Sequence, residues 1–76
     1  MRPLTYRIDR LYHRFLKPEG IGIDKLHFLA TALFDHGFIE IVRSETNPDD
    51  ERYYETEKLT SRQHRDELFK IIGRLK

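Results

Sequence analysis

The sequence predicts a small α+β domain whose elements follow the order α-β-α-β-β-α. Three observations lead to this class. Apolar residues recur at helical spacing in three stretches, β-rich runs flank a turn-forming segment, and glycine or proline stands at the boundaries between elements. With 76 residues, the chain is expected to form a single domain, residues 1–76, with a thin core.

The first predicted helix covers residues 3–17. Pro3 suits its first turn, because the missing N–H would have no partner there in any case. Apolar side chains then recur at helical spacing, at Leu4, Ile8, Leu11 and Phe15. Pro18 disfavours helix at the residue before it, so the helix is expected to end there. Residues 21–23 are predicted to form a short strand.

The second predicted helix covers residues 25–36 and leads directly into a β-hairpin. Asp24 is the expected N-cap, and Gly37 stands where a left-handed C-cap is needed. One helix face is apolar, with Leu26, Leu29, Ala30, Leu33 and Phe34. The β-rich runs 38–43 and 52–56 are separated by turn-forming residues, which predicts a hairpin with a long polar tip.

The third predicted helix covers residues 61–75. Thr60, followed three residues later by Gln63, has the pattern of a capping box. Its apolar face would carry Leu68, Ile71, Ile72 and Leu75. A helix that ends at glycine and continues straight into a hairpin is the layout of a winged helix, so the expected fold is a winged-helix domain with the hairpin as its wing.

Several motifs around the hairpin carry a family resemblance. Residues 33–40 resemble the L-x-x-x-G-[LF]-I-x passage of MarR- and PadR-type winged-helix regulators. The turn at 47–52 is similar to their wing tip, in which acidic residues precede an arginine. The pairs 53–54 and 59–60 are similar to the second wing strand and to the Leu-Thr that opens the next helix. The resemblance covers about residues 24–64.

This resemblance implies a transcriptional regulator that binds duplex DNA as a dimer. The helix before the hairpin would lie in the major groove, and Arg52 at the wing would enter the minor groove. The chain departs from the family in having one helix fewer before the hairpin, and it lacks the long helices used for dimerisation. Either the helix-turn-helix is shortened, or the helix at 3–17 serves as its first helix.

The DNA-binding hypothesis selects eight side chains. Those expected to touch bases are Lys25, His27 and Thr31, and those expected at the wing or on phosphates are Arg43, Arg52, Arg7, Arg10 and Arg14. Residues 4–17 hold four basic side chains and one acid, which suits phosphate contact. The alternative for this basic stripe is a solvated helix face whose arginines pair with acids elsewhere.

A second hypothesis is a winged-helix module that binds protein as an adaptor or inhibitor. Phe28 and Phe69 are the expected anchors of that interface, and the acidic hairpin would meet a basic protein surface. Residues 44–57 hold six acids and one base, and the net charge of the whole chain is only +1. Both features favour protein over DNA.

Other functions receive little support from the sequence. The chain has no cysteine, its four histidines lack metal-ligand spacing, and no glycine-rich phosphate loop is present. We therefore expect no enzyme, no cofactor and no metal. No apolar run approaches the roughly 20 residues that cross a bilayer, and the N-terminal residues lack a secretory pattern. The expectation is a cytoplasmic protein without a membrane partner.

Overall fold

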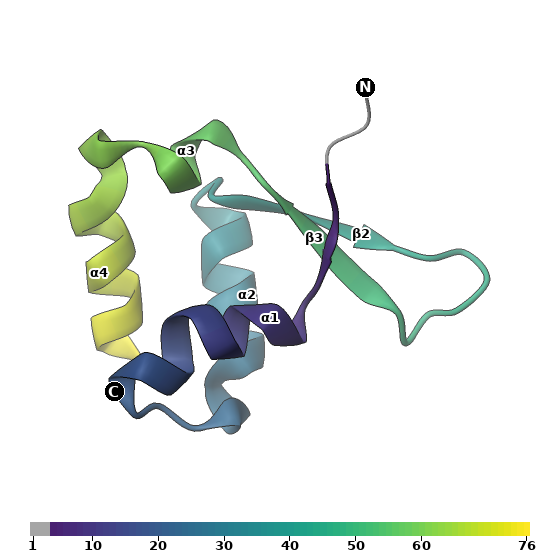
Figure 1. Ribbon diagram of the computed structural model, residues 1–76, viewed down its shortest axis with the longest axis horizontal. Coiled ribbons are helices and arrows are strands. Elements are labelled where there is room, and N and C mark those ends of the chain that lie inside the picture. The colour runs from purple at the N-terminus through teal and green to yellow at the C-terminus, as the bar shows by residue number, and fades with distance from the viewer. Residues whose placement is uncertain (1–3) are drawn as a thin grey trace.

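The computed structural model describes residues 4–76 as helices packed on a three-stranded antiparallel sheet (Figure 1). In chain order, the elements are β1 (Tyr6–Arg7), α1 (Asp9–Leu11), the π-helical turn η1 (Tyr12–Leu16), the 3-10 turns η2 (Lys17–Glu19) and η3 (Ile23–Lys25), α2 (Leu26–Asp35), β2 (Ile39–Arg43), β3 (Glu51–Glu55), α3 (Glu57–Thr60), the 3-10 turn η4 (Arg62–His64) and α4 (Arg65–Arg74). The predicted α+β class is confirmed.

The N-terminal segment differs from the predicted helix over 3–17. Tyr6 pairs with Tyr53 in β3, and the Ile8 N–H donates to the Glu51 carbonyl at 3.3 Å, so helix begins only at Asp9. These contacts satisfy backbone groups along one edge of β3, which a helix at the same residues would leave open. The role predicted for Pro3 lies outside the described residues.

No strand forms at residues 21–23, which is a second correction. The chain turns at Gly20, whose φ of 70° is left-handed, and the Ile21 N–H donates to the Leu16 carbonyl at 3.0 Å. Ile21 is buried beneath this turn. The third strand of the sheet therefore precedes the first helix, and the order is β-α-α-β-β followed by two helices rather than α-β-α-β-β-α.

The junction between α2 and the hairpin follows the sequence closely. Gly37 has a φ of 79°, its N–H bonds to the Phe34 carbonyl at 3.0 Å, and the Phe38 N–H bonds to the Leu33 carbonyl at 2.8 Å. This pair of hydrogen bonds is a Schellman motif, which requires a residue free to adopt positive φ. The predicted hairpin is confirmed by the pairing of β2 with β3. The predicted N-cap at Asp24 is wrong, because Asp24 lies inside η3 and makes no capping hydrogen bond.

The last predicted helix starts later than its sequence pattern indicated. Residues 57–60 form the short helix α3, and Ser61 is extended, with φ −77° and ψ 129°. The Thr60 hydroxyl donates to the Glu57 carbonyl at 3.1 Å instead of capping the next helix. The capping box is therefore wrong, while α4 lies within the predicted range.

The core lies between the helices and one face of the sheet. Ile39 and Tyr53 point from that face into the interior, where they join buried residues of the helices, Leu11, Leu16, Leu29, Leu33, Leu68, Ile71 and Ile72. The opposite face carries exposed side chains, Arg7, Glu40, Val42 and Arg52. In Figure 1 the helix α2 stands between α4 and the sheet, and the hairpin extends away from the helices.

Candidate functional sites at the two edges of the sheet

The strand order β1-β3-β2 gives the sheet two different edges. Tyr53 of the central strand pairs with Tyr6 of β1 on one side and with Ile41 of β2 on the other, so the three side chains form one row on the inner face. The helix α1 contacts β1, and α2 contacts β2. A cavity lies beside each of these contacts.

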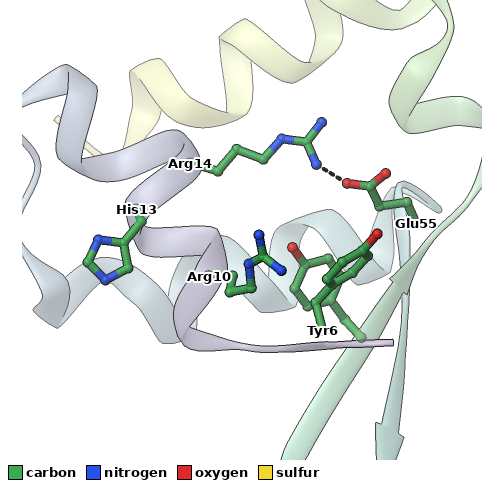
Figure 2. Close-up of a pocket in the computed structure, with 6 residues that line it drawn as sticks. Tyr6, Arg10, His13, Arg14 and Glu55 are labelled. Carbon is green, nitrogen blue, oxygen red and sulfur yellow. Dashed lines mark hydrogen bonds and ion pairs between the residues drawn. The ribbon is translucent and has the colours of Figure 1, made fainter. Parts of the chain in front are cut away.

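The cavity at the β1 edge is polar and has a volume of about 540 Å³. We call it the arginine pocket, and its lining residues are Tyr6, Arg10, His13, Arg14, Tyr53 and Glu55. Figure 2 shows Arg10 and Arg14 extending from the helical segment toward the strands, while His13 points away from them. Two of the eight predicted DNA contacts therefore face a concave site rather than open solvent.

The two arginines of this pocket have different partners. Arg14 forms an ion pair with Glu55 across the gap between helix and strand, drawn as a dashed line in Figure 2. The Arg10 guanidinium lies over the Tyr6 ring, 4.9 Å from its centroid. Among residues 4–76, no acidic side chain forms an ion pair with Arg10. Its positive charge is thus held against an aromatic ring and remains available for an anion.

Tyr53 forms the floor of the arginine pocket and is only 2% exposed. Burial raises the pKa of its phenol, and the nearby positive charges of Arg14 and Arg10 offset part of that rise. Its ring centroid is 5.7 Å from that of Tyr6 at a tilt of 41°. The pocket therefore combines two guanidinium groups with a neutral phenol and an aromatic wall.

The cavity at the β2 edge is mainly apolar, with a volume of about 500 Å³. We call it the apolar groove, and its lining residues are Thr31, Phe34, Ile41 and Arg43. Phe34 is 45% exposed here, although its spacing had placed it on the buried face of the helix. Phe28, six residues earlier on α2, is 58% exposed and does not line this groove. Two large apolar side chains of α2 are thus exposed.

The backbone of β2 is open along the same edge. The Thr56 N–H donates to the Phe38 carbonyl at 3.1 Å, so Phe38 faces β3. Since successive residues of a strand alternate in direction, the N–H and C=O groups of Ile39, Ile41 and Arg43 point away from β3. An edge strand with free backbone groups is a template for pairing with another chain.

The predicted base contacts of α2 gather around Phe28. The Lys25 ammonium lies 5.6 Å from the centre of the Phe28 ring, and the His27 ring centroid lies 6.1 Å from it. Thr31 lines the apolar groove. The helix expected to read bases therefore presents an aromatic cluster with one ammonium group.

Three predicted DNA contacts have acidic partners nearby. Arg43 pairs with Glu51 across the hairpin at 3.4 Å, Arg52 pairs with Asp50 at 3.3 Å, and Arg7 pairs with Asp9 at 3.7 Å. These partners reduce the net positive charge that a phosphate would meet. Arg7 and Arg52 lie directly opposite each other on the outer sheet face, whereas Arg10 and Arg14 line the pocket.

The two predicted protein anchors lie on different helices. Phe28 belongs to α2, and Phe69, which is 61% exposed, belongs to α4. Tyr53 and Glu55 were not predicted as site residues, and Tyr6 was placed within the predicted helix over 3–17. The pairing of β1 with β3, which brings Tyr6 and Tyr53 together, joins two segments that are distant in sequence.

Within residues 4–76, no group of three or more histidine or acidic side chains could hold a metal ion. None of the helices in this part of the chain has the length and apolar character needed to span a membrane. No protein-family model matches the chain, and no curated protein or solved structure matches it either.

Proposed function

We propose that this chain is a winged-helix type of protein-binding module whose binding surface is the apolar groove together with Phe28. The α1–η1 segment takes the place of the first helix of a helix-turn-helix, α2 that of the second, and the β2–β3 hairpin that of the wing. The observation that carries the proposal is the exposure of Phe28 and Phe34 on α2, at 58% and 45%. Exposed aromatic side chains beside a cavity are typical anchors of protein interfaces.

The groove and the open edge of β2 favour an extended partner segment. Such a segment can pair with the outward backbone groups of Ile41 and Arg43 and place alternate side chains in the groove. Apolar side chains suit the wall formed by Phe34 and Ile41. Toward the hairpin turn, the exposed acids Glu45 and Asp49 favour basic residues at that end of the partner.

The charge distribution supports protein over DNA as the partner. Of the five arginines expected to contact DNA, four have an acidic partner, and the remaining one, Arg10, lies in the arginine pocket. Binding to a DNA backbone depends on a surface with net positive charge that displaces counterions, and these acidic partners lower that net charge. The outer side of α2 adds only Lys25 and carries the acid Asp35.

Selection from a phage-displayed library of random twelve-residue peptides tests this function. We expect enriched peptides with alternating apolar residues, whose affinity falls by about tenfold or more on Phe34→Glu, because a buried aromatic anchor is worth at least about 1 to 2 kcal/mol. Phe69→Glu is the matched control, since Phe69 is a similarly exposed aromatic on another helix. Circular dichroism checks that both variants fold. Peptides that keep their affinity for Phe34→Glu, or a library without enrichment, would contradict the proposal.

Duplex DNA is the second candidate, and the succession of α1–η1, α2 and hairpin favours it. An amide-resolved NMR titration with a generic duplex at low and moderate salt distinguishes the two. Shifts around Lys25, His27 and Arg52 that fade as salt rises, and that weaken on Arg52→Ala, would establish DNA binding. Unchanged spectra at low salt would exclude it.

A further inference from the structure

We infer that the arginine pocket binds a small phosphate monoester, independently of the surface on α2 and β2. The pocket lies at the β1 edge, whereas the apolar groove lies at the β2 edge, with the central strand between them. Nothing in the proposed protein-binding role uses these side chains. The failure of either proposal therefore leaves the other standing.

Arg10 supplies the first phosphate-binding group. Its guanidinium carbon lies over the Tyr6 ring, 4.9 Å from the centroid, and the group has no ion-pair partner among residues 4–76. A cation–π contact uses the charge of the guanidinium and none of its N–H groups, which can therefore donate to a ligand. A planar fork of donors fits two oxygens of one phosphate, which is the geometry that makes arginine suited to this anion.

Arg14 supplies the second group from the following turn of the same helical segment. Residues four apart on a helix share one face, and both guanidinium groups reach the same cavity. Arg14 spends one N–H on Glu55 and lies 5.0 Å from the Phe15 ring centroid. These two contacts fix the orientation of the guanidinium group and thus of its remaining N–H groups. A phosphate with three terminal oxygens can bond to both arginines at once.

Glu55 lowers the positive charge of the pocket without cancelling it. The two guanidinium groups and the one carboxylate leave a formal charge of +1, which attracts anions more weakly than the two arginines alone would. Because this attraction grows with the charge of the ligand, a doubly charged monoester is favoured over chloride or a singly charged carboxylate. The ion pair with Arg14 also keeps the guanidinium in place while the pocket is empty.

The size of the pocket indicates that the ligand has an organic part. About 540 Å³ exceeds what an inorganic phosphate fills and lies in the range of small-molecule sites. The rings of Tyr6 and Tyr53 both line the pocket and provide an aromatic wall. A monoester with a ring-sized group therefore fits better than the bare ion.

The test is an NMR titration with phenyl phosphate and, separately, with inorganic phosphate, at an ionic strength held constant with sodium chloride. We expect saturable shifts at the amides of Tyr6, Arg10 and Arg14, with phenyl phosphate binding more tightly. Arg10→Gln should weaken binding by about tenfold, because it removes a charge-assisted hydrogen-bond donor. Glu55→Gln should tighten binding by a factor of a few, since it removes a repelling carboxylate.

Arg7→Gln is the matched control. Arg7 is an arginine of the same segment, but its side chain lies on the outer sheet face and pairs with Asp9, so its loss should leave phenyl phosphate binding unchanged. Shifts that do not saturate, or that are equal in the wild type and Arg10→Gln, would overturn the proposal. It would also fail if a DNA duplex shifts these amides while both phosphate probes leave them unmoved, because the pocket would then bind backbone phosphates of nucleic acid.

Discussion

The two edges of the sheet share a central strand but have opposite chemistry. At the β1 edge, the row that starts at Tyr53 continues to Tyr6, and charged side chains of the first helical segment close the cavity. At the β2 edge, the same row continues to Ile41, and Phe34 of α2 closes the other cavity. The polar pocket and the apolar groove therefore differ in two respects. One is the residue next to Tyr53, which is Tyr6 at the pocket and Ile41 at the groove, and the other is the helical segment that covers that residue.

The difference shows how a thin core can support two kinds of binding site. The β1 edge holds its charges in place through an ion pair and an aromatic contact, so a polar site exists without buried unpaired groups. The β2 edge leaves apolar surface and strand backbone uncovered. A small anion suits the first edge and a polypeptide segment suits the second.

Replacing Tyr53 with alanine should have the largest effect, because this side chain supports both edges. It is 2% exposed, and truncating a buried aromatic costs about 3 to 5 kcal/mol. Urea unfolding of the wild type and Tyr53→Ala measures the loss. Tyr54→Ala is the control, since Tyr54 is half-buried and alternates to the outer face. Equal losses in the free energy of unfolding for the two variants would show that Tyr53 does not support the two edges more than a residue of the outer face does.

Alkaline pH should destabilise the fold through the same side chain. The pKa of Tyr53 is raised by burial above its usual value of about 10, so folding favours the neutral phenol. That contribution is fully present below about pH 10 and is lost as pH rises through the pKa of the folded state. Urea unfolding from pH 8 upward should show a steeper fall in the free energy of unfolding for the wild type than for Tyr53→Phe. Parallel curves would contradict the prediction.

The coupling energies of the ion pairs at the two edges, Arg14–Glu55 and Arg43–Glu51, should differ by the smallest amount of these effects. A double-mutant cycle with Arg14→Gln and Glu55→Gln should give a coupling of about 0.2 to 1 kcal/mol, which decreases with added salt. The side chains of this pair are 46% and 25% exposed, against 75% and 42% for Arg43 and Glu51. We expect the second pair to couple more weakly, because solvent screens it more. A coupling energy that is larger for Arg43 and Glu51 than for Arg14 and Glu55 would contradict this prediction.

Local signals account for the parts of the fold that were predicted. The α2 helix, its glycine C-cap and the hairpin depend on contacts within residues 26–55, and all of them are confirmed. The strand at residues 6–7 could not be predicted in the same way, because it pairs with β3, which lies far along the chain. Thr60 shows the reverse error, since its capping pattern was present but the extended Ser61 separates it from the next helix.

The candidate sites were predictable only as residue types. Arg10 and Arg14 were recognised as basic, but their convergence on a pocket depends on the pairing of β1 with β3. Phe34 has the spacing of a core residue, yet it is 45% exposed and lines the apolar groove. Of the hairpin arginines expected to contact DNA, Arg52 pairs with Asp50, two residues before it in sequence, whereas Arg43 pairs with Glu51 on the opposite strand.

The two-residue strand β1 has a consequence for how the chain folds. The lining of the apolar groove comes from the contiguous stretch between Thr31 and Arg43, whereas that of the arginine pocket runs from Tyr6 to Glu55. Closing a longer loop costs more chain entropy, and a two-residue strand offers few contacts in return. During synthesis, the groove can form from neighbouring segments as soon as β3 has left the ribosome and paired with β2. The pocket can form only after that strand has emerged and residues 6–7 have paired with it.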